Sequence, residues 1–228
     1  MAGVLSAAGY RVIAVARKPS EELSAAAENA KNVGKGAIEF RPLDLSNLAE
    51  IAPFVRAVKA EFGAPYGLVN NAGLGTSGVL GVTMDRDIEA LIKLNTTSPI
   101  IMTKYVVRSM MVARTGRVIN IASIVAATGF NALSVYSATK ASLVGFTRSL
   151  AREVGQFNIT VNALAPGFVD TEMTAVMGEE DRDRIVKRSA LRRLAEPEDI
   201  ARSVEFLLGD GGRNITGTVL TIDAGNTA

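Results

Sequence analysis

The chain contains no cysteine and no histidine, and these two absences exclude several kinds of chemistry. Disulfides, thiolate nucleophiles, Cys/His zinc sites and Ser-His-Asp triads are all excluded, and we expect no metal site. Acid–base chemistry must therefore come from Tyr, Lys, Asp, Glu or the substrate itself. A chain without disulfides suits a reducing compartment, so we expect a cytoplasmic protein.

Long apolar runs and a strong charge imbalance are also lacking. No stretch approaches the roughly 18 uninterrupted apolar residues of a membrane-spanning helix. No basic segment follows Met1, so we expect no signal peptide and no membrane partner. The net charge is +2, which gives no indication of nucleic-acid binding. The densest basic stretch, Arg182–Arg193, is interrupted by Asp183, and we interpret it as a solvated helical face, with a phosphate-binding patch as the alternative.

The 228 residues are 48% hydrophobic and alternate between short β-branched runs and helical patterns. This alternation predicts a parallel sheet with helices on both faces, and no linker divides residues 1–228, so we expect a single α/β domain. The expected strands are 11–16, 37–43, 67–70, 117–122, 160–165 and 218–223. The expected helices are 20–31, 48–62 with a kink or a later start at Pro53, 83–114 with interruptions, 136–154 and 197–209.

Ligands of such sheets bind beyond the carboxyl ends of the strands. The residues that follow predicted strand ends are therefore the first candidates, namely Arg17, Asp44, Asn71, Ser123 and Pro166.

The sequence YSATK places Tyr136 and Lys140 four residues apart, on one face of a predicted helix. A free Tyr has a pKa of about 10, and a nearby ammonium favours the phenolate and lowers that pKa. The pair would then be a workable proton donor or acceptor. A half-buried Tyr beside a snorkelling Lys is the alternative interpretation of this pattern taken alone.

Several further motifs stand in a fixed order around this pair. NNAG (70–73) follows one strand, Ser123 ends the strand RVINIAS, and APG (165–167) with Thr171 follows a third strand. Together with YSATK they resemble the short-chain dehydrogenase/reductase family, and the resemblance runs to the C-terminal ITGTVLTIDAG. The stretches GRVINIAS, YSATKASLVGFTRSLARE and ITVNALAPGFVDTEMT are most similar to the 3-oxoacyl-acyl-carrier-protein reductase branch. The fold that this implies is Rossmann-like.

The resemblance implies a role for each matching residue. Tyr136 would donate a proton to the carbonyl oxygen, Ser123 would orient the carbonyl, and Lys140 would lower the Tyr136 pKa and hold the nicotinamide ribose. Asn95, in LIKLNTTSP, matches the family's helix Asn that supports a water-mediated proton relay to the Lys. Without the resemblance, Asn95 would be interpreted as a polar residue inside a helix. The implied cofactor-binding residues are Arg17, Lys18, Asp44, Leu45, Asn71, Ala72, Gly73, Tyr136, Lys140, Pro166, Gly167, Val169 and Thr171. Asp44 also reads as a cap for the following helix.

The cofactor can also be inferred from charge. An acidic residue after the second strand of a dinucleotide-binding fold favours NAD, whereas a basic residue accommodates the 2′-phosphate of NADP. Arg17 and Lys18 follow that strand here, which favours NADP(H), a solvated pair being the alternative.

One expected feature does not occur in the sequence. The family opens with a strand and a Gly-rich turn, T-G-x-x-x-G-x-G, whereas MAGVLSAAGYRVIAVAR matches the end of the first helix and the second strand. The difference is about twenty residues, and the turn would bind the pyrophosphate. Without that strand, two buried strands would either keep unpaired backbone groups or pair directly. We weigh a start at an internal Met against a truncated paralogue that acts as a silent subunit, and favour the former or a recent truncation.

The sequence thus predicts NADPH-dependent reduction of a ketone, with a 3-oxoacyl thioester as the best substrate hypothesis and another small ketone, sugar or polyol as the alternative. Arg184, Lys187, Arg188, Arg192 and Arg193 could meet an acyl carrier protein, although a solvated lid is favoured. The resemblance implies a homotetramer.

Overall fold

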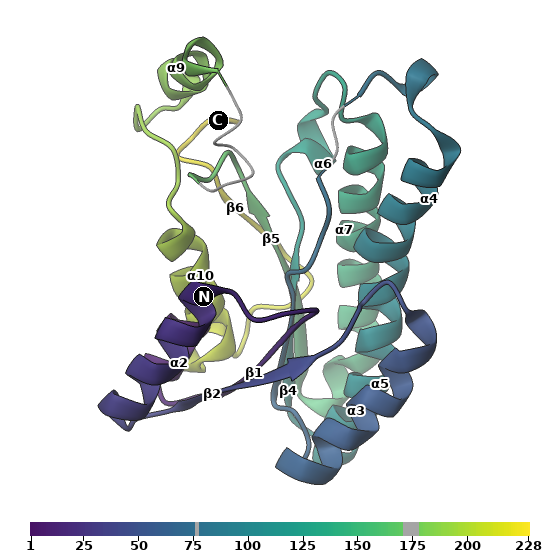
Figure 1. Cartoon of the computed structure of the whole chain (residues 1–228), viewed down its shortest axis with the longest axis vertical. Coiled ribbons are helices and arrows are strands. Elements are labelled where there is room, and N and C mark those ends of the chain that lie inside the picture. The colour runs from purple at the N-terminus through teal and green to yellow at the C-terminus, as the bar shows by residue number, and fades with distance from the viewer. Residues whose placement is uncertain (76–77, 171–177) are drawn as a thin grey trace.

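The computed structural model describes residues 1–75, 78–170 and 178–228, in which strands and helices alternate as predicted (Figure 1). The strands are β1 (Arg11–Ala16), β2 (Ala37–Pro42), β3 (Gly67–Asn70), β4 (Gly116–Ile121), β5 (Ile159–Pro166) and β6 (Val219–Ile222). The longer helices are α1 (Ala2–Ala7), α2 (Glu21–Val33), α3 (Leu48–Phe62), α4 (Asp85–Ile92), α5 (Ser98–Ala113), α7 (Ser134–Val154), α9 (Glu179–Arg188) and α10 (Pro197–Leu208). Short helical segments are α6 (Val125–Thr128), η1 (Leu80–Val82), η2 (Lys93–Thr97), η3 (Gly155–Phe157) and η4 (Asp210–Gly212).

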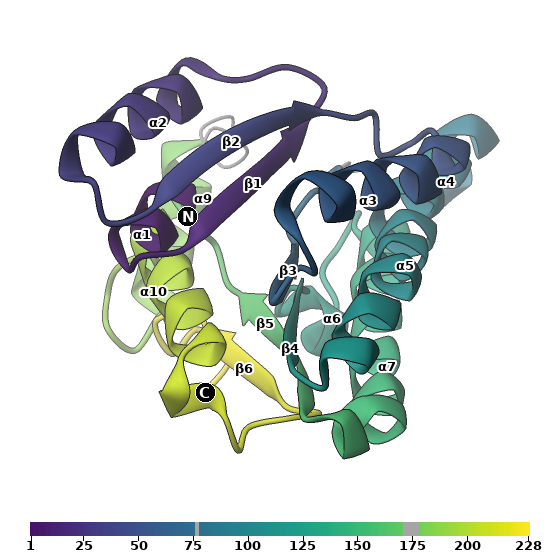
Figure 2. The same ribbon diagram turned by 90° about the horizontal axis from the view of Figure 1, so that it is seen from below.

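Every strand pairing is parallel, and helices cover both faces of the strands, so the predicted Rossmann-like α/β fold is confirmed. Figure 2 shows α3, α5 and α7 on one side and α1 and α10 on the other. Two apolar clusters fill these layers. One contains Ile51, Met110 and Val161, and the other contains Ile119, Leu164 and Val204.

The strands form two separate sheets. β1 pairs with β2, while the other four strands follow the order β3-β4-β5-β6. The sequence left open whether β1 and β3 pair directly or keep unpaired edges. In the structure these two strands do not pair with each other. Within the described residues, the inner edge of β1 and the free edge of β3 have no strand partner.

Burial along the strands follows this division. All residues of β4 are buried, and so are those of β5 up to Ala165, because both strands have neighbours on both edges and helices on both faces. No residue of β1 or β3 is fully buried, although both strands are apolar in composition. Both strands were expected to be buried, whereas the structure leaves them half-buried.

Most predicted element boundaries are confirmed to within two residues. Ser20 caps α2 by accepting a hydrogen bond from the Leu23 N–H at 3.2 Å, as predicted. Helix α3 runs from Leu48 to Phe62 with Pro53 inside it, so the expected later start is wrong. The predicted 83–114 helix is divided into α4, the π-helical turn η2 and α5. Helix α9 has no buried residue, in keeping with the predicted solvated face.

Candidate active site

Ser123, Tyr136 and Lys140 come together at the carboxyl end of β4. Ser123 lies two residues beyond β4, and the other two lie on the first turns of α7. Ser123 acts on Tyr136 as a side-chain hydrogen-bonding partner that lowers the pKa of the phenol, and the Lys140 Nζ lies 5.6 Å from the centre of the Tyr136 ring. Their positions agree with the predicted catalytic group, whose roles remain predictions.

Lys140 is a buried cation, and its ammonium has one hydrogen-bond partner among the described residues. Its residue is 5% exposed, and Nζ donates a hydrogen bond to the Ile121 carbonyl oxygen at 2.8 Å. Burial lowers the pKa of Lys140 from 10.5 to about 8, because the charged form loses its hydration. A lysine donates three hydrogen bonds, so this geometry leaves donors for a ligand.

The Tyr136 phenol differs from the sequence expectation. Burial raises the pKa of Tyr136 above its ordinary value of 10, and the hydrogen bond with Ser123 opposes that shift only in part. The expected lowering by Lys140 is not met in this structure, where desolvation dominates for both groups. Tyr136 is therefore protonated at neutral pH and available as a proton donor.

Asn95 holds the loop after β3 against helix α7. Its Oδ1 accepts a hydrogen bond from the Leu74 N–H at 2.8 Å, and its Nδ2 donates to the Leu74 carbonyl at 2.8 Å and to the Thr139 Oγ1 at 3.2 Å. Asn95 is 1% exposed and lies in η2, where the wider π-helical turn interrupts a long helix. Such π turns often occur at functional sites. Asn95 thus connects two other segments of the chain, which goes beyond the alternative interpretation of a polar residue inside a helix.

Gly73 lies in the narrow space between Asn95 and Lys140. A Cβ at this position would be 3.3 Å from Asn95 Oδ1 and 3.4 Å from Lys140 Nζ. Only glycine keeps this space free for a ligand that approaches the backbone and the ammonium. The residues present thus fit the ribose of a nicotinamide cofactor at this end of the site. Of the other loop residues predicted to contact the cofactor, Asn71 and Ala72 are exposed.

The residues predicted to bind the other end of the cofactor follow β1 and β2. Arg17 and Lys18 are exposed, and the charge of Arg17 helps to lower the pKa of Asp44. The larger causes of that lowering are the hydrogen bonds that Asp44 Oδ1 accepts from the Ser46 hydroxyl at 2.6 Å and N–H at 2.8 Å. Asp44 thus stabilises the turn before α3, but the alternative interpretation of Asp44 as the helix cap is wrong, because the N-cap residue of α3 is Asn47. Leu45 is half-buried beside it.

The third predicted segment follows β5. The Pro166 carbonyl accepts a hydrogen bond from the Ile124 N–H at 3.0 Å, which links this segment to the loop that carries Ser123. Gly167 packs against β6 so closely that a Cβ would lie 2.6 Å from that of Asp223. Val169 forms a parallel bridge with Ala195. Thr171 lies outside the described residues.

A chain of hydrogen-bonded amides beneath the site, from the half-buried Asn70 to the buried Asn120, was not predicted from the sequence. Asn70 Nδ2 donates to Asn120 Oδ1 at 2.7 Å and to Thr103 Oγ1 at 2.9 Å, and Asn120 Nδ2 donates to Thr147 Oγ1 at 2.8 Å. These bonds tie β3 and β4 to α5 and α7. The available signal was an asparagine in each of the apolar strands GLVN and RVINIA, since a buried amide requires partners.

A hollow of about 350 Å³ borders Tyr136. Its walls come from the start of α4 with the preceding segment and from the start of α7, including Met84, Arg86, Leu133 and Val135. The hollow thus lies beside the candidate catalytic group, although Ser123 and Lys140 do not line it.

Known proteins with similar sequences and structures were then compared with the chain. The family model described as enoyl-(acyl carrier protein) reductase matches residues 1–227. The 3-oxoacyl-(acyl-carrier-protein) reductase FabG of Haemophilus influenzae is 39% identical over 223 residues, which cover 97% of this chain and 89% of that protein. FabG of Escherichia coli is 36% identical over 225 residues, covering 99% of this chain and 90% of the relative.

Solved structures give the same result. A short-chain alcohol dehydrogenase described as putative, from Sinorhizobium meliloti, superimposes with a TM-score of 0.92 at 28% identity, covering 99% of this chain and 89% of that one. A double mutant of a Serratia marcescens short-chain dehydrogenase/reductase has a TM-score of 0.90 at 31% identity, covering 100% and 93%. The chain belongs to the short-chain dehydrogenase/reductase family, whose members are NAD(P)-dependent oxidoreductases.

Proposed function

We propose that the chain reduces a ketone to a secondary alcohol with NADPH, and that a 3-oxoacyl thioester is the substrate. The observation that carries this proposal is the grouping of a protonated Tyr136 with Ser123 and the buried Lys140. The names of the FabG relatives support the substrate, since those proteins are 3-oxoacyl reductases. In this proposal residues 1–228 act as one catalytic domain.

Each residue of the group has a step that its geometry supports. When bound, NADPH would supply the hydride for the carbonyl carbon. Tyr136 donates its phenolic proton to the carbonyl oxygen as charge develops there, and its raised pKa keeps that proton in place before the reaction. Ser123, which acts on the pKa of the neighbouring Tyr136 phenol, would hold the same oxygen. Lys140 directs its free donors to the ribose hydroxyls beside Gly73, and Asn95 fixes the loop that forms this space.

Replacement of the phenol tests the catalytic assignment. Tyr136→Phe removes the proton donor and should lower kcat by about 10²–10⁴-fold, with little change in the melting temperature. Tyr105→Phe is the matched control, because Tyr105 lies on α5 within an apolar cluster and should keep full activity. Full turnover by Tyr136→Phe with 3-oxoacyl thioesters would overturn the assignment.

The cofactor proposal makes a separate prediction. Arg17 and Lys18 favour the 2′-phosphate, so NADPH should bind more tightly than NADH when ligand fluorescence and melting temperature are followed. Arg17→Glu together with Lys18→Glu should reverse this order. Equal affinity for both cofactors in the unmodified chain would contradict the role of the two cations.

A second candidate function is that of a silent subunit, which would not bind the cofactor and would pair with another member of the family. Saturable NADPH binding by the 228-residue chain excludes this alternative, whereas a folded chain without binding favours it.

For the active protein we propose a cytoplasmic homotetramer, with an acyl carrier protein binding the exposed cations of α9. Another small ketone, sugar or polyol is the alternative substrate.

A further inference from the structure

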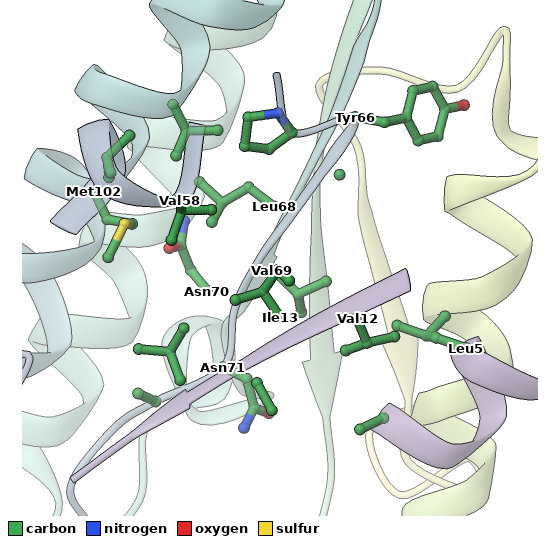
Figure 3. A pocket seen from close by; sticks show the side chains of 18 of the residues that line it. Leu5, Val12, Ile13, Val58, Tyr66, Leu68, Val69, Asn70, Asn71 and Met102 are labelled. Carbon is green, nitrogen blue, oxygen red and sulfur yellow. The ribbon is translucent and has the colours of Figure 1, made fainter. Parts of the chain in front are cut away.

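Two cavities among the described residues differ in what they border. One, of about 740 Å³, lies between the two sheets with Val12 and Leu68 in its walls, and no residue of the candidate catalytic group is among the described residues that line it (Figure 3). The other, of about 350 Å³, borders Tyr136 between the start of α4 and the start of α7. We call it the α4–α7 hollow. A ligand in this hollow would lie beside Tyr136 but away from Ser123 and Lys140.

The walls of the α4–α7 hollow carry apolar side chains that are open to solvent. Val82 is 81% exposed and Met84 is 57% exposed, and both line the hollow just before α4. Leu133 and Val135 line it from the start of α7 and are half-buried. Exposed apolar side chains that gather around a hollow are typical of a site for an apolar ligand.

Polar groups in these walls are already used within the protein. The Gly78 N–H donates to the Ala132 carbonyl at 2.8 Å, which fastens one wall to the other. The Thr83 hydroxyl donates to the backbone carbonyl four residues earlier at 3.2 Å. The two charged residues of the lining, Arg86 and Asp87, pair with each other at 3.8 Å. An occupant would therefore be held mainly through apolar surface.

The two sides of the site differ in polarity. Figure 1 shows α4 and α9 on opposite sides of the end of the molecule at which β4 and β5 terminate. Helix α9 ends with the cations Lys187 and Arg188, whereas the hollow at α4 is apolar. A 3-oxoacyl thioester has the same asymmetry, because a polar thioester arm and an apolar acyl tail extend from opposite sides of its reducible carbonyl.

We propose that the α4–α7 hollow binds the acyl tail of the substrate, so that the chain prefers long 3-oxoacyl thioesters to short ones. This inference rests on the proposed function. The tail lies along Val82 and Met84 while the thioester arm extends toward α9. Each methylene that is fully withdrawn from water raises affinity about fourfold. Because the walls stay partly open to solvent, the factor for each methylene of the tail should be smaller.

The preference for chain length is measured with NADPH and thioesters of N-acetylcysteamine. We expect kcat/KM to be at least 30-fold higher for the 3-oxodecanoyl than for the 3-oxobutanoyl thioester. Val82→Asp places a carboxylate in the hollow and should lower this ratio at least 10-fold. Leu80→Asp is the matched control, because Leu80 is 55% exposed on the same segment but is not among the residues that line the hollow. It should keep the ratio within 2-fold.

A second measurement requires no turnover, so it separates a failure of the tail site from a failure of the proposed function. The probe is decanoyl-N-acetylcysteamine, which lacks the reducible carbonyl, and its tail protons are followed by nuclear Overhauser effects to protein methyl groups. We expect saturable binding with contacts to Val82, Met84, Leu133 and Val135, and none to Leu80. The acetyl thioester should give no contacts.

Three results would overturn the inference. The first is equal kcat/KM for the long and the short thioester. The second is a loss of the ratio in Leu80→Asp as large as that in Val82→Asp. The third is a decanoyl tail that contacts other residues at saturation. A chain that reduces neither thioester overturns the proposed function alone if the decanoyl contacts occur at the hollow, and overturns both if they are absent.

Discussion

At the scale of single residues, the feature that sets the chemistry is a cation held out of water. Within the described part of the chain, the Lys140 ammonium has one carbonyl partner at 2.8 Å and forms no ion pair with a carboxylate. The buried charge therefore lowers the stability of the folded state. A bound ligand with several hydroxyls would offset this loss by accepting hydrogen bonds from the ammonium.

Because burial lowers the pKa of Lys140, the free energy of unfolding should depend on pH in a definite direction. Burial lowers the pKa of Lys140 to about 8 in the folded chain, against 10.5 when exposed. Between these values the unfolded chain binds more protons, so the free energy of unfolding should rise from pH 8 toward pH 10, by at most about 3 kcal/mol. Below pH 8 the full penalty persists. Above pH 10 the raised pKa of Tyr136 acts in the opposite direction.

Lys140→Met isolates this contribution, because it keeps the buried stem and removes the charge. Urea unfolding at pH 7.5, 8.5 and 9.5 should show a rise in the parent chain that is absent in the variant. The variant should also be the more stable of the two at pH 7.5. An equal pH slope in both chains would show that Lys140 is not desolvated.

At the scale of elements, the π-helical turn η2 connects the loop after β3 to α7 through one side chain. The three hydrogen bonds of Asn95 reach Leu74 and Thr139, which are 21 and 44 residues away in sequence. If residues 93–97 continued as an ordinary α-helix, the Asn95 side chain would leave the helix axis in a different direction. The wider turn thus sets where the side chain lies.

Asn95→Ala removes all three bonds and leaves the Leu74 backbone without this partner. We expect the free energy of unfolding to fall by about 2–4 kcal/mol and the Leu74 amide to exchange faster. Asn29→Ala, on the exposed face of α2, is the matched control and should change stability by less than about 0.5 kcal/mol. An undiminished stability in Asn95→Ala would show that water replaces the amide at no cost.

The elements also show what the sequence could and could not predict. Apolar runs such as RVIAVA and the cap at Ser20 depend on local physics, so these boundaries were predicted closely. Tyr136 and Lys140 were paired from their spacing on one helix face, Ser123 was a candidate because it follows a predicted strand end, and the resemblance to the family joined the three. The raised Tyr136 pKa was missed, because burial depends on residues distant in sequence. The η2 turn and the Asn70–Asn120 pair were missed for the same reason.

At the scale of the whole molecule, the division into two sheets predicts uneven stability. β4 and β5 are buried with partners on both edges, whereas β1 is half-buried with one partner. Opening of the β1–β2 sheet should therefore cost less than global unfolding. Native-state exchange should show amides of Val12 and Ala14 exchanging about 100-fold faster than those of Val118 and Val161. Equal protection at all four amides would show that the two sheets unfold as one unit.

The position of the amino terminus has a practical consequence for work with this chain. Met1 lies beside the cavity between the two sheets, and burial lowers the pKa of its terminal amine. Its carbonyl accepts a hydrogen bond from the Leu5 N–H at 3.1 Å, so it forms part of the first turn of α1. An affinity tag fused at Met1 would change the surroundings of this turn. The exposed carboxyl end at Ala228 is therefore the end at which to attach a label, a surface linker or a fusion partner.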